Sequence, residues 1–305
     1  MIGGRGTAVA IALLGAALAT AGCGLGPGSG VGDVKLTVTR DFGTVPMLHR
    51  QLDDVTEADT VMRVLERNAD ISTIYGGDFV QSIEGLEGET RNGEQFDWLF
   101  YVNGVESTVG AAAFDLKGGE SVWWDYRDWS AALQVPAVVG SWPQPFLDGY
   151  EGERHPVAVE CLGGGAACAE VRGRLHDENV PLSSASQDAA IRVLVGPWVR
   201  LRADPAAAQI ERGSQVSGVF AQFRLGREGY ELQGLSEDGK PSRRFGPGAG
   251  LVSATRRYGD PPVWVVTGAT AVGVRSAAGL LDAADLRDHY AVAVERGERT
   301  ALPSR

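Results

Sequence analysis

Three prolines within ten residues, Pro136, Pro143 and Pro145, restrict the fold of this chain more than any other local feature. Proline has no backbone N–H to donate and fixes its own φ angle, so residues 135–150 cannot form a helix or a central strand. The stretch also contains aromatic residues, so it can pack against a neighbouring domain instead of hanging free as a flexible linker. We therefore interpret residues 135–150 as a proline-rich seam that divides the chain.

The length supports a division at this seam. The sequence has 305 residues, of which about 283 remain after an N-terminal leader is removed, and chains of this size usually form two hydrophobic cores. We predict an α+β protein with a first domain before the seam and a second domain after it. The predicted segments are a signal peptide at 1–22, a tether at 23–32, a first domain at 33–134, the seam at 135–150 and a second domain at 151–305.

Composition excludes several classes of protein. Hydrophobic residues make up 44% of the chain and charged residues 22%, which is typical of a folded globular protein and not of a disordered one. The net charge of -11 leaves no excess of basic groups to neutralise phosphates, so we expect no nucleic acid partner. The same charge disfavours binding to an anionic lipid surface.

The N-terminus has the pattern of an export signal. Arg5 precedes an apolar run that ends at Cys23, and the run is shorter than the roughly 20 residues needed to span a bilayer. The segment resembles a bacterial lipoprotein signal, although Thr20 stands where that family usually has leucine. We expect lipidation of Cys23 and a place on the outer face of the cell membrane, with a glycine-rich tether at 23–32. Ordinary cleavage and a soluble secreted product are the alternative.

Cysteine usage fits an oxidising compartment. Apart from Cys23, the chain contains only Cys161 and Cys168, and we expect them to form a disulfide. Free thiols and a metal site are the alternatives. The metal site is disfavoured because His155 and His176 do not complete a compact ligand spacing, and we predict no metal.

The first domain reads as a small sheet with one helix. Residues 34–39 alternate between apolar and polar, as in a half-buried strand. Thr56 and Asp59 resemble a capping box that begins a helix, and Asn103 and Gly104 predict a tight hairpin turn. Further strands are predicted at 79–83, 98–102 and 121–126, with Val122, Trp124 and Tyr126 on one face of the last strand and Trp123 and Asp125 on the other.

Four segments of this domain resemble a known family. They are Tyr75–Gly77, Ser82–Leu86, Asp97–Gly104 and Gly118–Tyr126. These segments resemble the transcobalamin-like C-terminal domain, the DUF4430 family, over residues 33–130. The resemblance implies a β-grasp-like fold, and it implies a corrinoid as the ligand to consider, because the same domain caps the ligand in vitamin B12 carriers.

The aromatic residues of this domain are the candidate ligand contacts. Five large aromatic residues within 29 positions cannot all be buried in a sheet with only one face covered. Part of this aromatic surface must therefore meet the second domain, a ligand or a partner. The candidate ligand-binding residues are Tyr75, Trp98, Tyr101, Asn103, Trp124 and Tyr126.

The second domain reads as an α/β mixed sheet. Strands are predicted at 156–161, 191–195 and 262–267, an antiparallel pair at 217–225 and 228–235, and a strand at 289–294 that closes the sheet. Helices are predicted from residue 166 onward, at 272–281 and at 250–257. No family resemblance is found for this half.

Candidate chemistry is sparse, and we predict no catalytic residue and no cofactor beyond a cobalamin-like ligand. The sequence contains no Gly-x-Ser-x-Gly, Ser-x-x-Lys or His-Glu-x-x-His motif, and its four histidines are isolated in the sequence. Three hypotheses remain. The first is an anchored binding module that captures a small molecule between its domains for a membrane transport system, the second is a cell-envelope interaction protein without a small ligand, and the third is an enzyme whose site assembles from distant loops.

Overall fold

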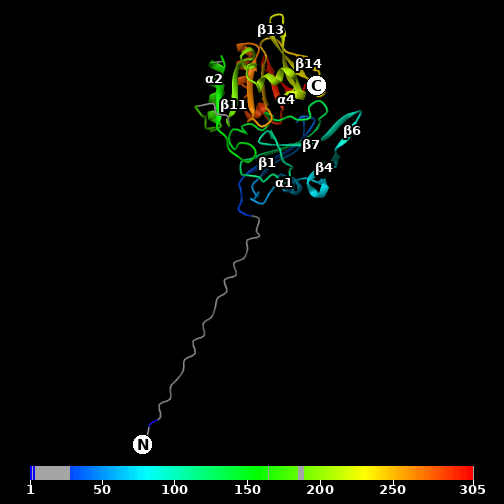
Figure 1. Cartoon of the computed structure of the whole chain (residues 1–305), viewed down its shortest axis with the longest axis vertical. Helices are drawn as coiled ribbons and strands as arrows, with labels where there is room; N and C mark the ends of the chain where they lie inside the picture. Colours follow the sequence, from blue (N-terminus) through cyan, green and yellow to red (C-terminus); the bar gives the residue numbers. More distant parts are fainter. Residues whose placement is uncertain (2, 4–27, 164, 185–188, 305) are drawn as a thin grey trace.

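The computed structural model describes residues 1, 3, 28–163, 165–184 and 189–304. It has two sheet-rich regions, one stacked on the other, with the proline-rich seam running between them (Figure 1). The fold is α+β, as predicted, with few helices and several mixed and antiparallel sheets.

The first region is built on a six-stranded mixed sheet. Its strands are β1 (Val34–Arg40), β2 (Val45–Leu52), β6 (Glu89–Arg91), β7 (Glu94–Val102), β8 (Val105–Glu106) and β9 (Ser121–Asp128). The order is β2-β1-β9-β7-β6, with β8 paired to β7, and the adjacent strands β1 and β9 are parallel. A separate small sheet contains β3 (Ile71–Ile74), β4 (Phe79–Ile83) and β5 (Leu86–Glu87), and the 3-10 turn η1 (Tyr75–Gly77) joins its first two strands.

The helix of this region, α1 (Val61–Asn68), begins later than the capping box predicts. Thr60 is the N-cap, and its side chain accepts a hydrogen bond from the backbone N–H of Arg63. The predicted pair, Thr56 and Asp59, does interact, because the Asp59 carboxylate accepts from both the backbone N–H and the hydroxyl of Thr56. This contact holds the loop ahead of the helix, so the assignment of Thr56 as the cap is wrong.

The hairpin turn and the two faces of β9 are confirmed. Asn103 and Gly104 have φ angles of 54° and 74°, as a type I′ turn requires, and they join β7 to β8. Val122, Trp124 and Tyr126 belong to the core under α1, whereas Trp123 belongs to a core shared with the second region. The first sheet therefore has both faces covered, one by α1 and one by the second region.

The second region is built on another six-stranded mixed sheet. Its order is β10 (Val157–Cys161), β11 (Ile191–Pro197), β16 (Val263–Gly268), β15 (Gly250–Thr255), β17 (Ala291–Glu295) and β18 (Glu298–Leu302). The first three of these strands are parallel and the others antiparallel. The helices are α2 (Gly165–Asp177), α3 (Trp198–Leu201), α4 (Ser214–Ser217), α5 (Ala271–Ala278) and α6 (Ala283–Leu286), with the 3-10 segment η2 (Ala207–Arg212). A three-stranded sheet contains β12 (Ala221–Gly226), β13 (Gly229–Leu235) and β14 (Pro241–Arg244).

Two predictions for this region are wrong. Residues 250–255 form strand β15 and not a helix, and all six are buried between β16 and β17. Such a strand has no alternation of exposed and buried side chains, so its period cannot be read from the sequence. Strand β17 does not close the sheet either, because β18 pairs with its outer side.

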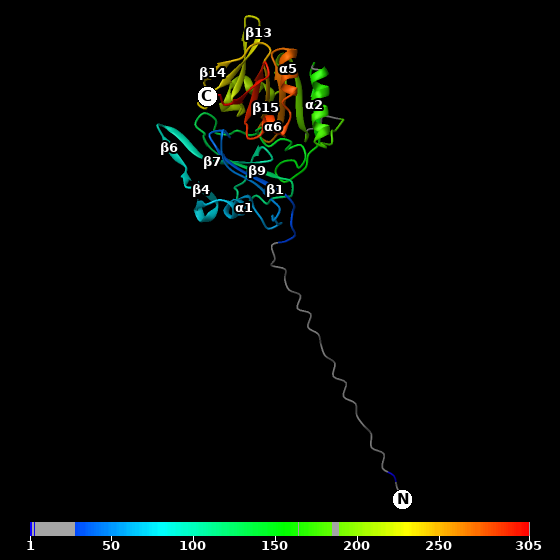
Figure 2. The same ribbon diagram turned by 180° about the vertical axis from the view of Figure 1, so that it is seen from behind.

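The second sheet lies between two layers. Helices α2 and α5 pack on one face and lie beside each other (Figure 2). The other face packs against η2, the sheet β12-β13-β14 and the first region. The predicted mixed, layered architecture is therefore present.

The seam is packed and not free. Trp142, Phe146 and Tyr150 are buried in the core of the second region, and the Phe146 ring lies 4.9 Å from the ring of Trp264. Asn103 ties the first region to the seam, because its side-chain amide donates to the carbonyl of Gly149. The seam thus joins the two regions through buried contacts.

The predicted disulfide between Cys161 and Cys168 is present, with the two Cα atoms 5.8 Å apart. Residues 29–31, the end of the predicted tether, lie along residues 55–57 through backbone hydrogen bonds. Cys23 lies outside the described residues. Within the part of the chain that the structure describes, no helix is both long enough and apolar enough to cross a membrane.

Candidate functional site

The two regions meet through a cluster of aromatic rings, which we call the aromatic contact: Phe42, Tyr101 and Trp123 from the first region and Tyr290 from the second. The Tyr290 ring lies 5.2 to 5.8 Å from each of the other three, in edge-to-face arrangements. All four residues are at most 3% exposed. The aromatic surface that the sequence left without a cover therefore meets the second region.

A buried carboxylate lies inside this contact. The side chain of Asp125 accepts hydrogen bonds from the Thr39 hydroxyl at 2.5 Å, the Gly43 backbone N–H at 3.1 Å and the Tyr290 hydroxyl at 2.9 Å. Burial raises the pKa of Asp125 to about 6, although these three donors and Arg127 act in the opposite direction. The Tyr290 hydroxyl thus links a carboxylate of the first region to the second.

Arg127 is buried in the same place. Its Nη1 donates to the carbonyls of Asp128 and Ala132, whereas Nε and Nη2 have no hydrogen-bond partner among the described residues. The negative charge of Asp125 and the ring of Phe42, whose centre lies 5.8 Å from the guanidinium, help to stabilise this buried positive charge. Because this cluster is fully enclosed, it serves the contact between the regions and offers no opening to a ligand.

The six side chains predicted to contact a ligand are mostly enclosed by protein. Tyr75 is 80% exposed, on η1, whereas the other five are less than 5% exposed. Tyr101 belongs to the aromatic contact, and Asn103 holds the hairpin turn and the seam. In this conformation five of the six contact protein groups, and their role in ligand binding stays a prediction.

The remaining three of these residues lie in the core under α1. The Trp98 indole donates to the Leu86 carbonyl at 2.8 Å, and the Tyr126 hydroxyl donates to the Glu87 carbonyl at 2.9 Å. Trp124 stacks on Phe100 with ring centres 4.8 Å apart. Trp98 and Trp124 also line a small recess of about 200 Å³ beside the aromatic core.

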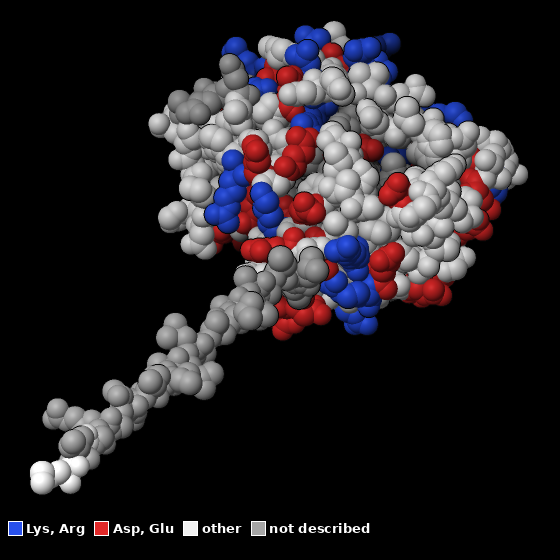
Figure 3. Space-filling view, turned by 60° about the horizontal axis from the view of Figure 1, so that its bottom comes forward, with Lys and Arg blue, Asp and Glu red and all other residues white. Residues whose placement is uncertain are grey.

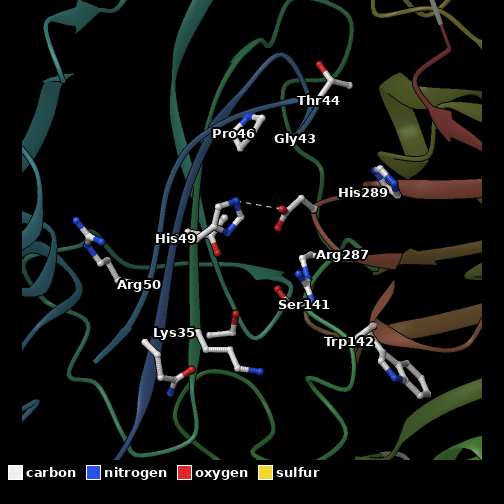
Figure 4. A pocket seen from close by; sticks show the side chains of 16 residues that line it. Lys35, Gly43, Thr44, Pro46, His49, Arg50, Ser141, Trp142, Arg287 and His289 are labelled. Atoms are coloured by element: carbon white, nitrogen blue, oxygen red, sulfur yellow. Dashed lines mark ion pairs between the residues drawn. The ribbon is translucent and has the colours of Figure 1, made fainter. Parts of the chain in front are cut away.

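An open cleft of about 760 Å³ lies beside the aromatic contact, and we call it the cationic cleft (Figure 4). One wall is formed by β1 and β2, and the other by the seam at 140–142 and the turn that follows α6. The side chains that carry its chemistry are Lys35, His49, Ser141, Arg287, Asp288 and His289.

Two glycines allow the walls to approach each other. A side chain at Gly43 would place its Cβ only 1.8 Å from the carbonyl oxygen of Asp288, and one at Gly140 would lie 2.7 Å from the backbone nitrogen of His289. Gly43 also has a φ angle of 80°, which few other residues adopt. The turn at 287–289 therefore sits directly against the first region, with the cleft at its side.

The charge of this cleft is mainly positive, in a protein of net charge -11. Lys35 and Arg287 line it, and neither forms an ion pair within the described residues. His49 Nε2 lies 3.5 Å from Asp288 Oδ2, and Figure 4 shows this pair as a dashed line, with the side chains of Lys35 and Arg287 below it in the view. Arg50 also lines the rim, with its guanidinium pointing away from the pair (Figure 4).

Unpaired polar groups lie in the same walls. The Ser141 hydroxyl and His289 Nδ1 are buried and have no hydrogen-bond partner among the described residues. Burial lowers the pKa of His289 below its ordinary value, so its ring is largely neutral at pH 7. Burial also raises the pKa of Asp288, and His49 and Arg287 partly offset that effect. Buried polar groups without a hydrogen-bond partner lower the stability of the fold unless a ligand or a water molecule forms that hydrogen bond.

Sequence reasoning missed this cleft. It treated His49 and His289 as isolated, because they are far apart in the chain and match no catalytic or metal-binding spacing. Only the register of β2 on β1, which pairs His49 with Thr37, and the close approach of the 287–289 turn bring them to one cleft. Such a juxtaposition depends on tertiary contacts that leave no local signal.

Residues 58–128 match the family described as "Domain of unknown function (DUF4430)". The DUF4430 segment runs from the loop before α1 to the end of β9, and it contains Tyr101, Trp123, Asp125 and Arg127. It therefore supplies much of the aromatic contact. Most of the cationic cleft lies outside the DUF4430 match, and Ser121 is the lining residue that falls within it.

Other comparisons add little. No curated protein matches the chain. A solved structure from Ruminococcus gnavus ATCC 29149, described as a "putative metal binding protein", is 15% identical and covers 32% of this chain and 97% of its own, with a TM-score of 0.25. A likeness at this level carries no argument about the present chain. Among the described residues, no group of three or more His, Cys, Asp and Glu side chains is arranged to hold a metal ion.

Proposed function

We propose that this protein is a binding module that captures a small anionic molecule, with a carboxylate or phosphate group, in the cationic cleft. The observation that carries the proposal is that Lys35 and Arg287 line one cleft and form no salt bridge within the described residues, while the Asp288 carboxylate there lies against His49. The buried Ser141 hydroxyl beside them has no hydrogen-bond partner among the same residues. Cations and hydroxyl donors that converge on one space form charge-assisted hydrogen bonds to an anion. A volume of about 760 Å³ suits a small organic molecule.

The cationic cleft belongs to a protein whose net charge is negative. Acidic and basic side chains are interspersed over the face seen in Figure 3. The protein as a whole repels anions at long range, so binding must come from short-range contacts in the cleft. This arrangement favours a compact anion over a long polyanion such as nucleic acid.

We further propose that the protein is exported and anchored through lipid on Cys23, and that it presents its ligand to a membrane transport system. The support is the sequence pattern of residues 1–22 and the oxidised pair Cys161–Cys168. Mass spectrometry of the N-terminal peptide from native membranes tests the anchor. A mass increment for acyl chains on Cys23 is the expected result, and an intact leader would contradict it.

Calorimetric titration of the full-length protein with inorganic phosphate and with citrate tests the binding proposal. We expect heat for at least one anion and an affinity that falls with added salt, since the contacts are ionic. Lys35→Ala and Arg287→Ala should each weaken binding, whereas Arg227→Ala, an exposed cation outside the cleft, should not. Equal effects of all three substitutions would contradict the proposal.

Cobalamin is a second arm of the same titration, because the resemblance of the first domain implies a corrinoid. A corrinoid offers a phosphodiester to the cations and amide groups to the unpaired donors. Binding of cobalamin that is lost in Lys35→Ala would identify the finer ligand class. Binding of phosphate or citrate without cobalamin would reject the corrinoid and keep the anion site.

A further inference from the structure

A second open cleft, of about 780 Å³, lies elsewhere on the junction and shares no lining residue with the cationic cleft. We call it the amide cleft. Its walls come from the first region at 106–108, from the seam and from the second region, including the loop 256–259. It thus joins all three parts of the fold, as ligand sites at domain junctions commonly do.

Three side-chain amides line this cleft: those of Gln134, Gln209 and Gln215. None of them makes a hydrogen bond within the described residues, and Nε2 of Gln209 is buried without a partner. Each amide offers both a donor and an acceptor. A buried amide N–H without an acceptor costs free energy, so we expect a ligand or a water molecule to accept a hydrogen bond from it when the site is filled.

The charged groups of the amide cleft are largely neutralised by each other. Arg256 Nη1 lies 2.8 Å from the Glu151 carboxylate, and Nε donates to the Asp260 carbonyl. The same guanidinium lies over the ring of Tyr150 at 4.9 Å, which fixes its position. Glu106 is partly buried and accepts from the backbone N–H of Val135, and its burial raises its pKa. Arg257, which also lines the cleft, has its Nε 3.7 Å from the Asp260 carboxylate. Both arginines of the amide cleft therefore have carboxylate partners, unlike Lys35 in the cationic cleft.

An aromatic ring stands at the edge of these polar groups. Tyr258 lines the cleft, is fully exposed at 102% and packs against no other aromatic ring of the described residues. An exposed ring offers an apolar face with a polar tip. A saccharide has the complementary surface, because its C–H groups lie on one face of the ring and its hydroxyls project at the edge.

We propose that the amide cleft binds a neutral carbohydrate. One face of a sugar ring packs on Tyr258, and its hydroxyls exchange hydrogen bonds with the amides of Gln134, Gln209 and Gln215. Two neighbouring hydroxyls of a sugar match one side-chain amide, because one hydroxyl can accept from the amide N–H while the other donates to the amide C=O. The carboxylate of Glu106 accepts a hydrogen bond from a further hydroxyl of the sugar. A free sugar and a sugar unit of a glycan chain present the same chemistry, and the length of the probe distinguishes them.

Saturation-transfer NMR on the full-length protein tests this inference. The probes are glucose, galactose, mannose and N-acetylglucosamine, each as the monosaccharide and as a tetramer. We expect saturation transfer to at least one probe, with Tyr258→Ala weakening its binding about tenfold. Equal binding of monosaccharide and tetramer indicates a free sugar as the ligand, and tighter binding of the tetramer indicates a glycan chain.

The matched control is Leu225→Ala, which removes another exposed apolar side chain that is absent from the lining of the amide cleft. Gln209→Leu should weaken binding as well, since it removes the unpaired amide. Phosphate binding by each variant reports on the fold and on the cationic cleft independently. No saturation transfer to any of these saccharides, or equal losses in Tyr258→Ala and Leu225→Ala, would overturn the proposal.

Discussion

The junction between the two regions has two parts that differ in how their charged side chains are buried and partnered. At the aromatic contact, Asp125 and Arg127 are enclosed by rings, and the carboxylate is completed by three protein donors. In the cationic cleft, Lys35 and Arg287 face open space and form no salt bridge within the described residues. Tyr290, in the first part, is only two residues from Asp288, in the second. One turn can thus close a junction between two regions and, at its margin, leave charged groups that are able to bind a ligand.

The difference has a physical origin. Rings that pack edge to face exclude water, so the groups among them must find partners within the protein. The cleft has no such cover, and water screens its charges until a ligand replaces that water. We therefore expect substitutions at the aromatic contact to change stability and substitutions in the cleft to change binding.

The largest effect is expected from Trp123→Ala. This change removes a buried ring from the aromatic contact and leaves the Thr39 hydroxyl without the indole N–H that now donates to it. We expect a loss of about 3–5 kcal/mol in the free energy of unfolding, measured by urea denaturation. Tyr258→Ala, at a fully exposed ring, should change stability by less than about 0.5 kcal/mol. A loss of less than about 1 kcal/mol for Trp123→Ala would contradict the role of the aromatic contact in stability.

Asp125 predicts a pH dependence of stability. The pKa of its carboxyl is about 6 in the folded protein and 3.8 in an unperturbed chain, so folding takes up a proton between these values. Its contribution to stability is therefore greatest below about pH 4 and falls as the pH rises to about 6. The difference between wild type and Asp125→Asn, measured by urea denaturation from pH 4 to pH 7, should change by roughly 1–3 kcal/mol with this sign.

Using that difference removes the effect of other carboxyls. Glu120, whose pKa burial raises to about 7, gives the same sign, and Asp59, whose pKa the Arg67 hydrogen bond lowers to about 2, gives the opposite sign. Both are present in wild type and variant, so they cancel. A difference curve that is flat between pH 4 and pH 6 would contradict the buried state of Asp125.

Substitutions in the cationic cleft are expected to lower anion affinity and to leave the free energy of unfolding nearly unchanged. Lys35→Ala and Arg287→Ala should each reduce anion affinity about tenfold, as expected for the loss of one charge-assisted hydrogen bond. Their free energies of unfolding should stay within about 0.5 kcal/mol of wild type, because neither cation forms an ion pair within the described residues. Calorimetry and urea denaturation of the same samples measure both quantities. A large stability loss without a binding loss would erase the distinction between the two parts.

How far the sequence predicts this structure depends on whether a feature is local. The turn at Asn103 and Gly104, the two faces of β9 and the disulfide were all predictable, because each depends on neighbouring residues or on a single pair. Strand β15 was not, because its uniformly buried residues show no period. The need for a cover over the aromatic surface was also predictable, although the ring that provides it, Tyr290, was not.

The site was far less predictable than the fold. The sequence drew attention to Trp98 and Trp124 because aromatic residues are conspicuous, and the structure places both in the core under α1. The cationic cleft instead combines side chains from β1, β2 and the 287–289 turn, which only tertiary packing brings together. Its most informative features are two cations that form no salt bridge and a buried hydroxyl that makes no hydrogen bond among the described residues, and a sequence cannot show such missing contacts.

The most direct test is an NMR titration of the His289 ring in the full-length protein with inorganic phosphate. Burial holds the pKa of His289 below its ordinary value in the free protein. A phosphate bound beside it supplies negative charge, so the account predicts that the pKa rises by about half a unit or more, and that Lys35→Ala and Arg287→Ala reduce this rise. A His289 titration curve unchanged by saturating phosphate would contradict the assignment of the cleft as an anion site.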